Sequence, residues 1–297
     1  MKSFLSVIEK AQKMGPFTIS VAGAEDYSLL MALKDAQDLG FVNPVLVGDS
    51  NQIESLSTEI GLRPLDIINS KSPEDSGAIA VSLVKNGSCD ILMKGMINTS
   101  IYMRAILNKE HGLRTNQLIS LLAAYEIPEY HKLLFCTDSG INVAPNLEQK
   151  KDIVNNALSA MQSLGIQRPK VAVLTANEMV DAKVQSTVDA KALVDMATIG
   201  QVMPCIIEGP ISFDIAFSPK AAEHKGINSN ISGDCDLLVF PNIETGNALG
   251  KSWLHFNKAK WAGIVLGASK PVILGSRSDT NEIKINSIAL GCLASSV

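Results

Sequence analysis

Residues 90–104 read DILMKGMINTSIYMR, and this stretch decides the fold of the chain. Its first apolar residues predict a short buried strand that ends at Lys94 and Gly95. A polar turn follows, and one of the residues 98–100 can cap a helix that continues to Arg104. A strand that leads at once into a helix is half of a strand–helix–strand unit, the building block of parallel sheets.

The same alternation of short apolar and longer amphipathic segments continues along all 297 residues. Strands are predicted at 17–22, 45–48, 91–94, 133–137, 171–175, 204–208, 237–240, 264–267 and 272–275. Helices are predicted at 26–39, 74–85, 147–164, 187–199 and 280–294. The pattern predicts an α/β fold with largely parallel sheets covered on both faces, and such sheets bind ligands at the carboxyl ends of their strands.

Composition excludes several classes of protein. The chain is 46% apolar and 19% charged with a net charge of −4, which argues against disorder and against general binding to nucleic acid or anionic membranes. No apolar run approaches the ~20 residues of a membrane span, and the first residues do not form a signal peptide. We therefore expect a cytoplasmic protein with no nucleic-acid or membrane partner. The five cysteines have neither the spacing of a zinc site nor that of a disulfide framework.

The turn after the predicted strand 91–94 is the first candidate for chemistry. Lys94, Asn98 and Thr99 surround the start of a helix, where unpaired backbone N–H groups favour an anion. Arg104 lies about one turn further on, and a guanidinium group can bind phosphate in a bidentate fashion. The alternative interpretation is a capped helix with a solvated arginine.

Other polar turns with glycine also follow predicted strands. In the segment 135–145, Gly140 permits close approach of the backbone, while Asp138 can either orient a ligand or cap the turn. The segment 241–251 contains Gly246 and Asn247, which suit either ligand approach or an ordinary loop. After the strand 272–275 come Ser276, Arg277 and Asp279, for which an Asp279 helix cap with a surface arginine is the alternative interpretation. We expect these turns to line one ligand-binding cleft.

Taken together, five motifs resemble the phosphate acetyl/butyryltransferase family, and the shorter butyryltransferase branch is the more similar. They are Met-Lys-Gly-x-x-Asn-Thr (93–99), Thr-Asp-x-x-Ile-Asn (137–142), Gly-Pro-Ile-Ser-Phe-Asp (209–214), Pro-x-Ile-Glu-x-Gly-Asn (241–247) and Ser-Arg-x-Asp (276–279). The resemblance implies two three-layer α/β domains with the active site in a cleft between them. It places residues 1–131 and 277–297 in the first domain and residues 132–276 in the second.

The resemblance also implies the reaction and the roles of the residues. Such enzymes interconvert acyl-CoA plus phosphate with acyl phosphate plus CoA, butyryl being the acyl group expected here and acetyl the alternative. Coenzyme A is a substrate, no metal or redox cofactor is expected, and the family commonly forms homodimers or higher homo-oligomers. Ser276 and Arg277 match a catalytic Ser-Arg pair, and Arg104 matches a phosphate-binding arginine. The substrate-binding set comprises Lys94, Asn98, Thr99, Arg104, Asp138, Gly140, Asn142, Gly246 and Asn247.

The identity of the base that deprotonates the CoA thiol stays open in the sequence. Asp279 is favoured, Glu282 is the nearest other carboxylate, and direct stabilisation of the thiolate by arginine would require no protein base. Two further alternatives keep the fold and change the function. They are a dehydrogenase on the same scaffold and a non-catalytic protein that binds CoA.

Overall fold

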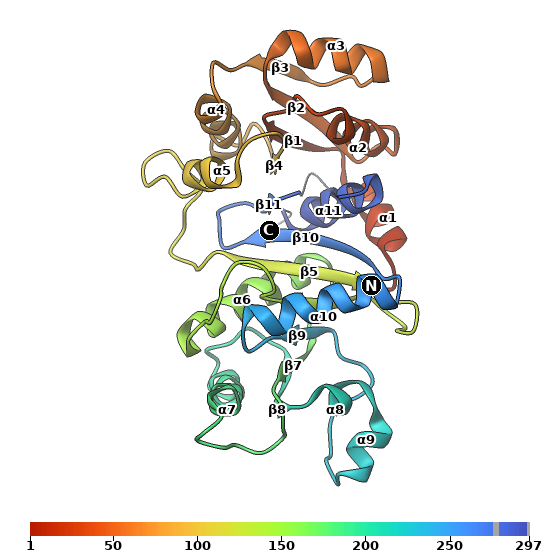
Figure 1. The fold of residues 1–297 in the computed structure, drawn as a ribbon, viewed down its shortest axis with the longest axis vertical. Helices are drawn as coiled ribbons and strands as arrows, with labels where there is room; N and C mark the ends of the chain where they lie inside the picture. The colour runs from red at the N-terminus through yellow and green to blue at the C-terminus, as the bar shows by residue number, and fades with distance from the viewer. Residues whose placement is uncertain (276–278, 296–297) are drawn as a thin grey trace. The chain divides into compact units, whose positions relative to one another are not determined.

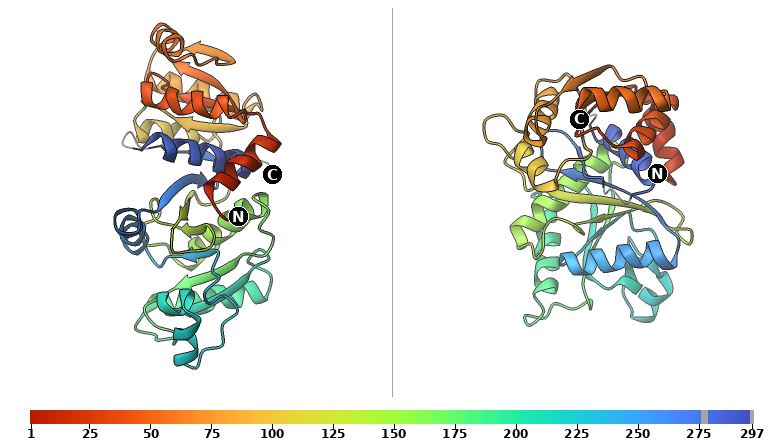
Figure 2. Two further views of the ribbon diagram at one scale, coloured as in Figure 1. Left: turned by 90° about the vertical axis from the view of Figure 1, so that its right-hand side faces the viewer. Right: turned by 45° about the horizontal axis from the view of Figure 1, so that its top comes forward.

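The computed structural model describes residues 1–275 and 279–295 of the chain and consists of two compact units. We call Phe4–Gln117 with Trp261–Val297 the N-terminal unit, and Met1–Ser3 with Leu118–Lys260 the central unit. Each is an α/β unit with a mostly parallel sheet (Figures 1 and 2). The predicted α/β fold class is therefore confirmed.

The sheet of the N-terminal unit has the strand order β3-β2-β1-β4-β11-β10, in which only β10 runs antiparallel to its neighbour β11. Its strands are β1 (Phe17–Ala22), β2 (Val42–Gly48), β3 (Asp66–Asn69), β4 (Ile91–Lys94), β10 (Lys260–Leu266) and β11 (Val272–Ile273). Its helices are α1 (Phe4–Met14), α2 (Tyr27–Asp38), α3 (Ser50–Ile60), α4 (Pro73–Lys85), α5 (Thr99–Ile106) and α11 (Asn281–Ala294). Helices α4 and α5 cover one face of the sheet, and α1, α2 and α11 cover the other (Figure 1).

The sheet of the central unit has the order β5-β6-β9-β7-β8, with β5 antiparallel and the remaining strands parallel. Its strands are β5 (Ser120–Glu126), β6 (Leu134–Thr137), β7 (Lys170–Leu174), β8 (Ile206–Ile211) and β9 (Leu237–Val239). Its helices are α6 (Leu147–Ser163), α7 (Gln185–Thr198), α8 (Phe213–Phe217), α9 (Pro219–His224) and α10 (Ile243–Phe256). Helices α6 and α7 cover one face, and α8 and α10 the other, where the rings of Phe213 and Trp253 lie 6.4 Å apart (Figure 1).

The central strands of both sheets are buried on both faces, which is why they appear in the sequence as continuous apolar runs. All four residues of β4 are buried, as are all four of β6 and all three of β9. The helices begin at polar caps: the Asp26 carboxylate accepts from the Leu29 N–H at the start of α2, and Asn146 forms a capping box with Gln149 at the start of α6. The strand ends and the helix starts that follow them are thereby held in fixed positions.

Two strands were not predicted, and the unit boundaries differ from the predicted ones. Strand β3 is a short edge strand with half-exposed residues, and β5 pairs antiparallel with β6, outside the strand–helix alternation. The contacts divide the chain after Gln117 and after Lys260, whereas the sequence placed the boundaries after 131 and after 276. Because β5 pairs with β6, residues from 118 onward belong to the central unit. Because β10 pairs with β11, residues from 261 onward belong to the N-terminal unit.

No described helix has both the length and the apolar character that crossing a membrane requires.

Candidate active site

The turn between β4 and α5 is built around a close approach of two backbone segments. The Met96 N–H donates to the Gly23 carbonyl oxygen at 2.6 Å, and the Gly95 N–H donates to that of Ala22 at 2.8 Å. A Cβ atom on Gly95 would lie 2.0 Å from the Gly23 oxygen, so this position requires glycine. The turn that carries Lys94 is therefore tied to the end of β1.

We expect Gly95→Ala to lower the free energy of unfolding by about 1–3 kcal/mol, because neither backbone segment can move away cheaply. Urea titration of the variant measures this loss. Gly275→Ala is the matched control, since the nearest atom of the described residues lies 4.0 Å from its added Cβ. Equal stability of the two variants would contradict the packing argument.

The start of α5 has the features that the sequence predicted for an anion site. Asn98 is the N-cap residue, yet its side chain makes no capping hydrogen bond, so the cap leaves the first-turn N–H groups available. Asn98 and Thr99 are both exposed. Arg104 is exposed in the last turn of the same helix, roughly 7.5 Å of helix rise beyond Thr99. The helix start and the Arg104 guanidinium are thus both accessible to a ligand.

Two buried lysines lie beside this turn, and the sequence pointed to only one of them. Lys94 is 8% exposed and Lys284, on α11, is 5% exposed. With Gly95 and Gly275 they line a small cavity of about 20 Å³. The Lys94 ammonium donates to the Ile97 carbonyl at 3.2 Å, and that of Lys284 donates to the Ser28 hydroxyl at 3.0 Å. The one lysine within the otherwise largely apolar helix 281–294 is the signal in the sequence that could have identified this second cation.

The described residues on either side of the Ser-Arg motif lie beside the same cavity. Ser276 and Arg277 lie outside the described residues, but Gly275 before them lines the cavity and the Asp279 carbonyl after them accepts from Lys284. The alternative role of Asp279 as the cap of α11 is wrong, because the N-cap residue is Thr280, whose hydroxyl accepts from the Ile283 N–H. The Asp279 carboxylate is therefore not used to cap the helix.

In the central unit, Asp138 organises the turn after β6. Its buried carboxylate accepts from the backbone N–H groups of Gly140, Ile141, Asn142 and Leu121 at 2.8–3.3 Å, and from the Asn142 side-chain amide at 2.7 Å. Asn142 also donates to the Ile119 carbonyl at 2.9 Å. These contacts support the turn-capping alternative for Asp138, and they leave its carboxylate few sites for a ligand.

The turns after β6 and β9 lie next to each other, as their shared position at strand ends predicted. A Cβ on Gly246 would lie 2.8 Å from the Ser139 Cβ and 2.5 Å from a ring carbon of Phe240. Gly246 is buried at this contact, whereas Gly140 and Asn247 are exposed. Glycine at 246 thus permits the first turn of α10 to approach the turn that contains Asp138.

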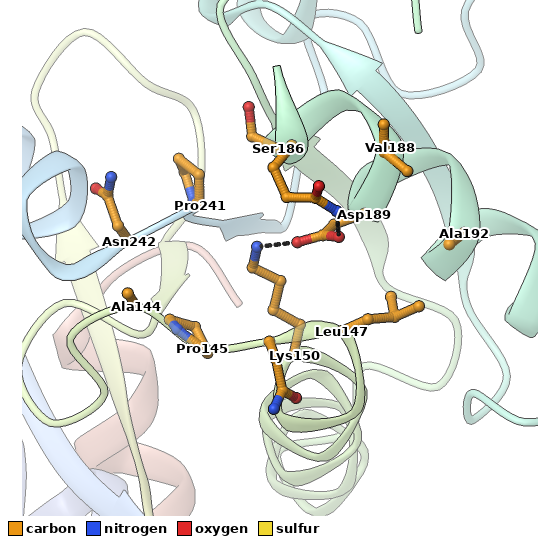
Figure 3. A pocket seen from close by; sticks show the side chains of 12 residues that line it. Ala144, Pro145, Leu147, Lys150, Ser186, Val188, Asp189, Ala192, Pro241 and Asn242 are labelled. Atoms are coloured by element: carbon orange, nitrogen blue, oxygen red, sulfur yellow. Dashed lines mark hydrogen bonds and ion pairs between the residues drawn. The ribbon is translucent and has the colours of Figure 1, made fainter. Parts of the chain in front are cut away.

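A cavity of about 730 Å³ opens at the carboxyl ends of β6, β7 and β9 in the central unit (Figure 3). The residues that line it come from the starts of α6, α7 and α10 and from the loops before them: Ala144, Pro145, Asn146, Leu147, Lys150, Gln185, Ser186, Val188, Asp189, Ala192, Pro241 and Asn242. Lys150 extends from α6 to Asp189 on α7, with 2.6 Å between Nζ and Oδ2. The sequence had singled out the segments of Pro145 and Asn242 but not the contribution of α7.

The cysteines do not fit a nucleophilic role. Burial raises the pKa of Cys89 and of Cys205 to about 11 and that of Cys235 to about 12, and it raises those of Cys136 and Cys292 well above the usual value. A thiol with such a pKa holds its proton at neutral pH and is a poor nucleophile. Among residues 1–275 and 279–295, no three His, Cys, Asp or Glu side chains cluster as metal ligands would.

Two mostly parallel α/β units, each with glycine-containing turns at its strand ends, define a ligand-binding α/β protein of the doubly wound kind. The chain belongs to the phosphate acetyl/butaryl transferase family, whose model matches residues 69–292. It is 40% identical to the phosphate butyryltransferase of Clostridium acetobutylicum over 99% of this chain and 98% of that protein. It is 38% identical to the phosphate acetyltransferase of Rickettsia typhi over 97% of this chain and 84% of that protein.

A solved structure supports the same assignment. A branched-chain phosphotransacylase from Enterococcus faecalis V583 matches with a TM-score of 0.82 and 32% sequence identity. The match covers 94% of this chain and 99% of that one. Family membership, predicted from the five motifs, is therefore confirmed over nearly the whole chain.

Proposed function

We propose that this protein transfers a short acyl group, butyryl in the first place, between coenzyme A and inorganic phosphate. The family match and the 40% identity to a phosphate butyryltransferase over almost the entire chain carry this proposal. A phosphate oxygen attacks the thioester carbonyl, the C–S bond breaks, and the thiolate of CoA leaves and takes up a proton. The products are acyl phosphate and free CoA.

In this reaction the N-terminal unit binds the phosphate. The available N–H groups at the start of α5 and the Arg104 guanidinium are the donors an anion requires, and the buried Lys94 ammonium adds positive charge beside them. Ser276 and Arg277 act on the carbonyl oxygen, which becomes an oxyanion in the tetrahedral intermediate. The high pKa values of the cysteines favour direct transfer between the two substrates over an acyl-cysteine intermediate.

For the base of the reverse reaction we propose Asp279, with Glu282 and direct stabilisation of the thiolate as the alternatives. A thiol of pKa about 8.5 gives its proton to an ordinary aspartate of pKa about 4 at a cost of about 6 kcal/mol. Asp279 therefore serves as the base only if proton transfer is concerted with attack on the carbonyl, or if its surroundings raise its pKa. If the arginines stabilise the thiolate directly, no protein base is needed.

We expect Asp279→Asn to lower turnover of acyl phosphate plus CoA and to change its pH profile, because the variant removes a proton acceptor. Rates measured from pH 6 to 9 check this. Thr280→Ala is the control, since it removes the α11 cap at a cost of about 1 kcal/mol without touching a carboxylate. An Asp279→Asn profile that follows the wild type would show that Asp279 is not the base.

Thiol release from a series of acyl-CoAs, acetyl to hexanoyl, with and without phosphate, tests the function itself. We expect release that requires phosphate and is fastest with butyryl-CoA. A maximum at acetyl-CoA would favour the acetyltransferase alternative. The difference between neighbouring chain lengths should be modest, because one methylene changes selectivity by only about 1–3 kcal/mol. Release that ignores phosphate would indicate a thioesterase and contradict the proposal. Reduction of a nicotinamide cofactor would indicate the dehydrogenase alternative.

Three further properties accompany the proposal. We propose that the enzyme acts in the cytoplasm, where both CoA and phosphate are available, and that it forms a homodimer or a higher homo-oligomer. We also propose that it acts without a metal or redox cofactor, because the transfer needs only hydrogen-bond donors and cations, which the chain itself supplies.

A further inference from the structure

Lys284 is a buried lysine that belongs to none of the five motifs. It lies in the first turn of α11, is 5% exposed, and lines the small cavity beside Lys94 and Gly275. We propose that Lys284 is a positioning residue, whose ammonium group attaches the chain that carries Ser276 and Arg277 to the rest of the N-terminal unit. This inference rests on the proposed function, since it takes the Ser-Arg pair to act on the acyl group.

The Lys284 ammonium joins two segments that are far apart in the sequence. It donates to the Ser28 hydroxyl at 3.0 Å, at the start of α2, and to the backbone carbonyl of Asp279. Asp279 comes directly after residues 276–278, and Gly275, directly before them, lines the same cavity. Because so few residues lie between these two points, a hydrogen bond at Asp279 restricts the positions open to the whole Ser-Arg motif.

Helix α11 can serve as the fixed end of this attachment. It packs against α1 and α2, and ten of its fourteen residues are buried (Figure 1). The Ser287 hydroxyl accepts from the Gly263 N–H of β10 at 3.1 Å, and a Cβ on Gly291 would lie 3.2 Å from a methyl carbon of Ile273. Core packing therefore holds the helix in place, with or without the two contacts of the Lys284 ammonium.

The small cavity lies where ligands bind in doubly wound folds. In the order β3-β2-β1-β4, the chain runs outward from β1 to β3 and then returns to β4 on the other side of β1. Asp26 and Leu29, which follow β1, and Lys94, at the end of β4, all line the cavity, which places it at this reversal. Its volume of about 20 Å³ holds a water molecule but not a phosphate ion. Lys284 therefore acts through the Ser-Arg motif and not by contact with substrate.

Lys284 is not half of a buried ion pair. In the central unit, the buried Lys150 pairs with Asp189 at 2.6 Å, whereas none of the ion pairs within residues 1–275 and 279–295 includes Lys284. A buried ammonium group is costly unless hydrogen bonds satisfy it, and an apolar residue would fill the same space at lower cost. What the lysine adds is the hydrogen bond to the carbonyl beside the Ser-Arg motif.

Lys284→Met tests the proposal, because it removes the ammonium and keeps most of the side-chain length. We expect kcat for butyryl-CoA and phosphate to fall about tenfold or more, since Ser276 and Arg277 lose their alignment with the carbonyl. The KM for either substrate should stay close to the wild-type value. Lys270→Met is the matched control, since Lys270 also donates to a backbone carbonyl, that of Ser295 at 3.2 Å, but at the opposite end of α11. Its kcat should equal that of the wild type.

Chemical rescue distinguishes the cation from the space that it fills. Lys284→Ala lacks the three carbons and the nitrogen that make up propylammonium, so this ion can occupy the vacated space. We expect propylammonium to restore part of kcat, and 1-propanol, which has a similar volume and no charge, to restore little. Thermal melting of each variant confirms that it is folded at the temperature of the assay.

Hydrogen–deuterium exchange of the full-length protein tests the attachment without catalysis. Peptides that contain residues 275–280 should exchange faster in Lys284→Met and in Ser28→Ala than in the wild type or in Lys270→Met. Ser28→Thr keeps the hydroxyl and should exchange like the wild type. Because Ser28 is exposed, its variants test the attachment even if Lys284→Met does not fold.

Several results would overturn the proposal. A folded Lys284→Met enzyme with wild-type kcat would show that the lysine only supports the fold, and a raised KM for phosphate at unchanged kcat would identify a substrate-binding cation. Equal rescue by propylammonium and 1-propanol would show that only volume matters, and unchanged exchange in both Lys284→Met and Ser28→Ala would disprove the attachment. Failure of the proposed function is separate, because the wild type would then lack phosphate-dependent thiol release, while exchange would still test the attachment.

Discussion

Replacing Arg277 with alanine is expected to lower turnover of butyryl-CoA and phosphate by at least about 100-fold while the protein stays folded. The reaction places negative charge on the carbonyl oxygen, and loss of one donor to an oxyanion typically costs about 2.7–4 kcal/mol. Arg277 is one of only five arginines in the chain, and it matches the arginine of the family's Ser-Arg pair. Initial rates of thiol release at saturating substrate measure the effect.

Two control variants distinguish a specific role of Arg277 in catalysis from the general effect of removing a positive charge. Arg63→Ala removes an exposed arginine that lies near neither Lys94 nor Gly275 in the sequence, and we expect its turnover to equal that of the wild type. Arg277→Lys keeps the charge but loses the planar donor fork, so it should restore only part of the activity. An Arg277→Ala enzyme with near wild-type turnover would remove this residue from the mechanism.

The sequence predicted the central strands well because burial on both faces leaves a simple apolar signature. Strands β4, β6 and β9 are buried along their whole length, and all three were predicted. The edge strand β3 has exposed residues at both ends and only two half-buried residues between them, so its apolar signal is weak. Strand β5 was not predicted for another reason: it pairs antiparallel with β6, its neighbour in the sequence, and therefore lies outside the strand–helix alternation.

For several site residues, the local sequence does not distinguish a role in ligand binding from a role in holding the fold. An aspartate in a glycine-containing turn has the same local sequence whether it binds a ligand or holds the turn, and only the five hydrogen bonds to Asp138 distinguish the two roles. Asp279 and Thr280 are both good caps, so the sequence alone could not choose between them. Lys284 belongs to no motif, and its position beside Lys94 follows only from the packing of α11 on the sheet.

The ion pair between Lys150 and Asp189 gives the largest expected effect on stability. We expect Lys150→Met to lower the free energy of unfolding by about 3–5 kcal/mol, because it leaves the Asp189 carboxylate buried without its cation. Gln185 donates to the other carboxylate oxygen at 2.8 Å, but a neutral amide does not replace a positive charge. Urea-induced unfolding followed by circular dichroism measures the change.

A double variant and a surface pair make this prediction specific. Lys150→Met with Asp189→Leu removes both charges and keeps similar volumes, so we expect it to recover most of the lost stability. Lys191→Met breaks the exposed pair with Asp195 on the same helix and should cost less than about 1 kcal/mol, since water screens that pair. If Lys150→Met cost no more than Lys191→Met, the buried pair would not hold α6 and α7 together. Because both helix starts line the cavity, its shape would then have to depend on the apolar contacts alone.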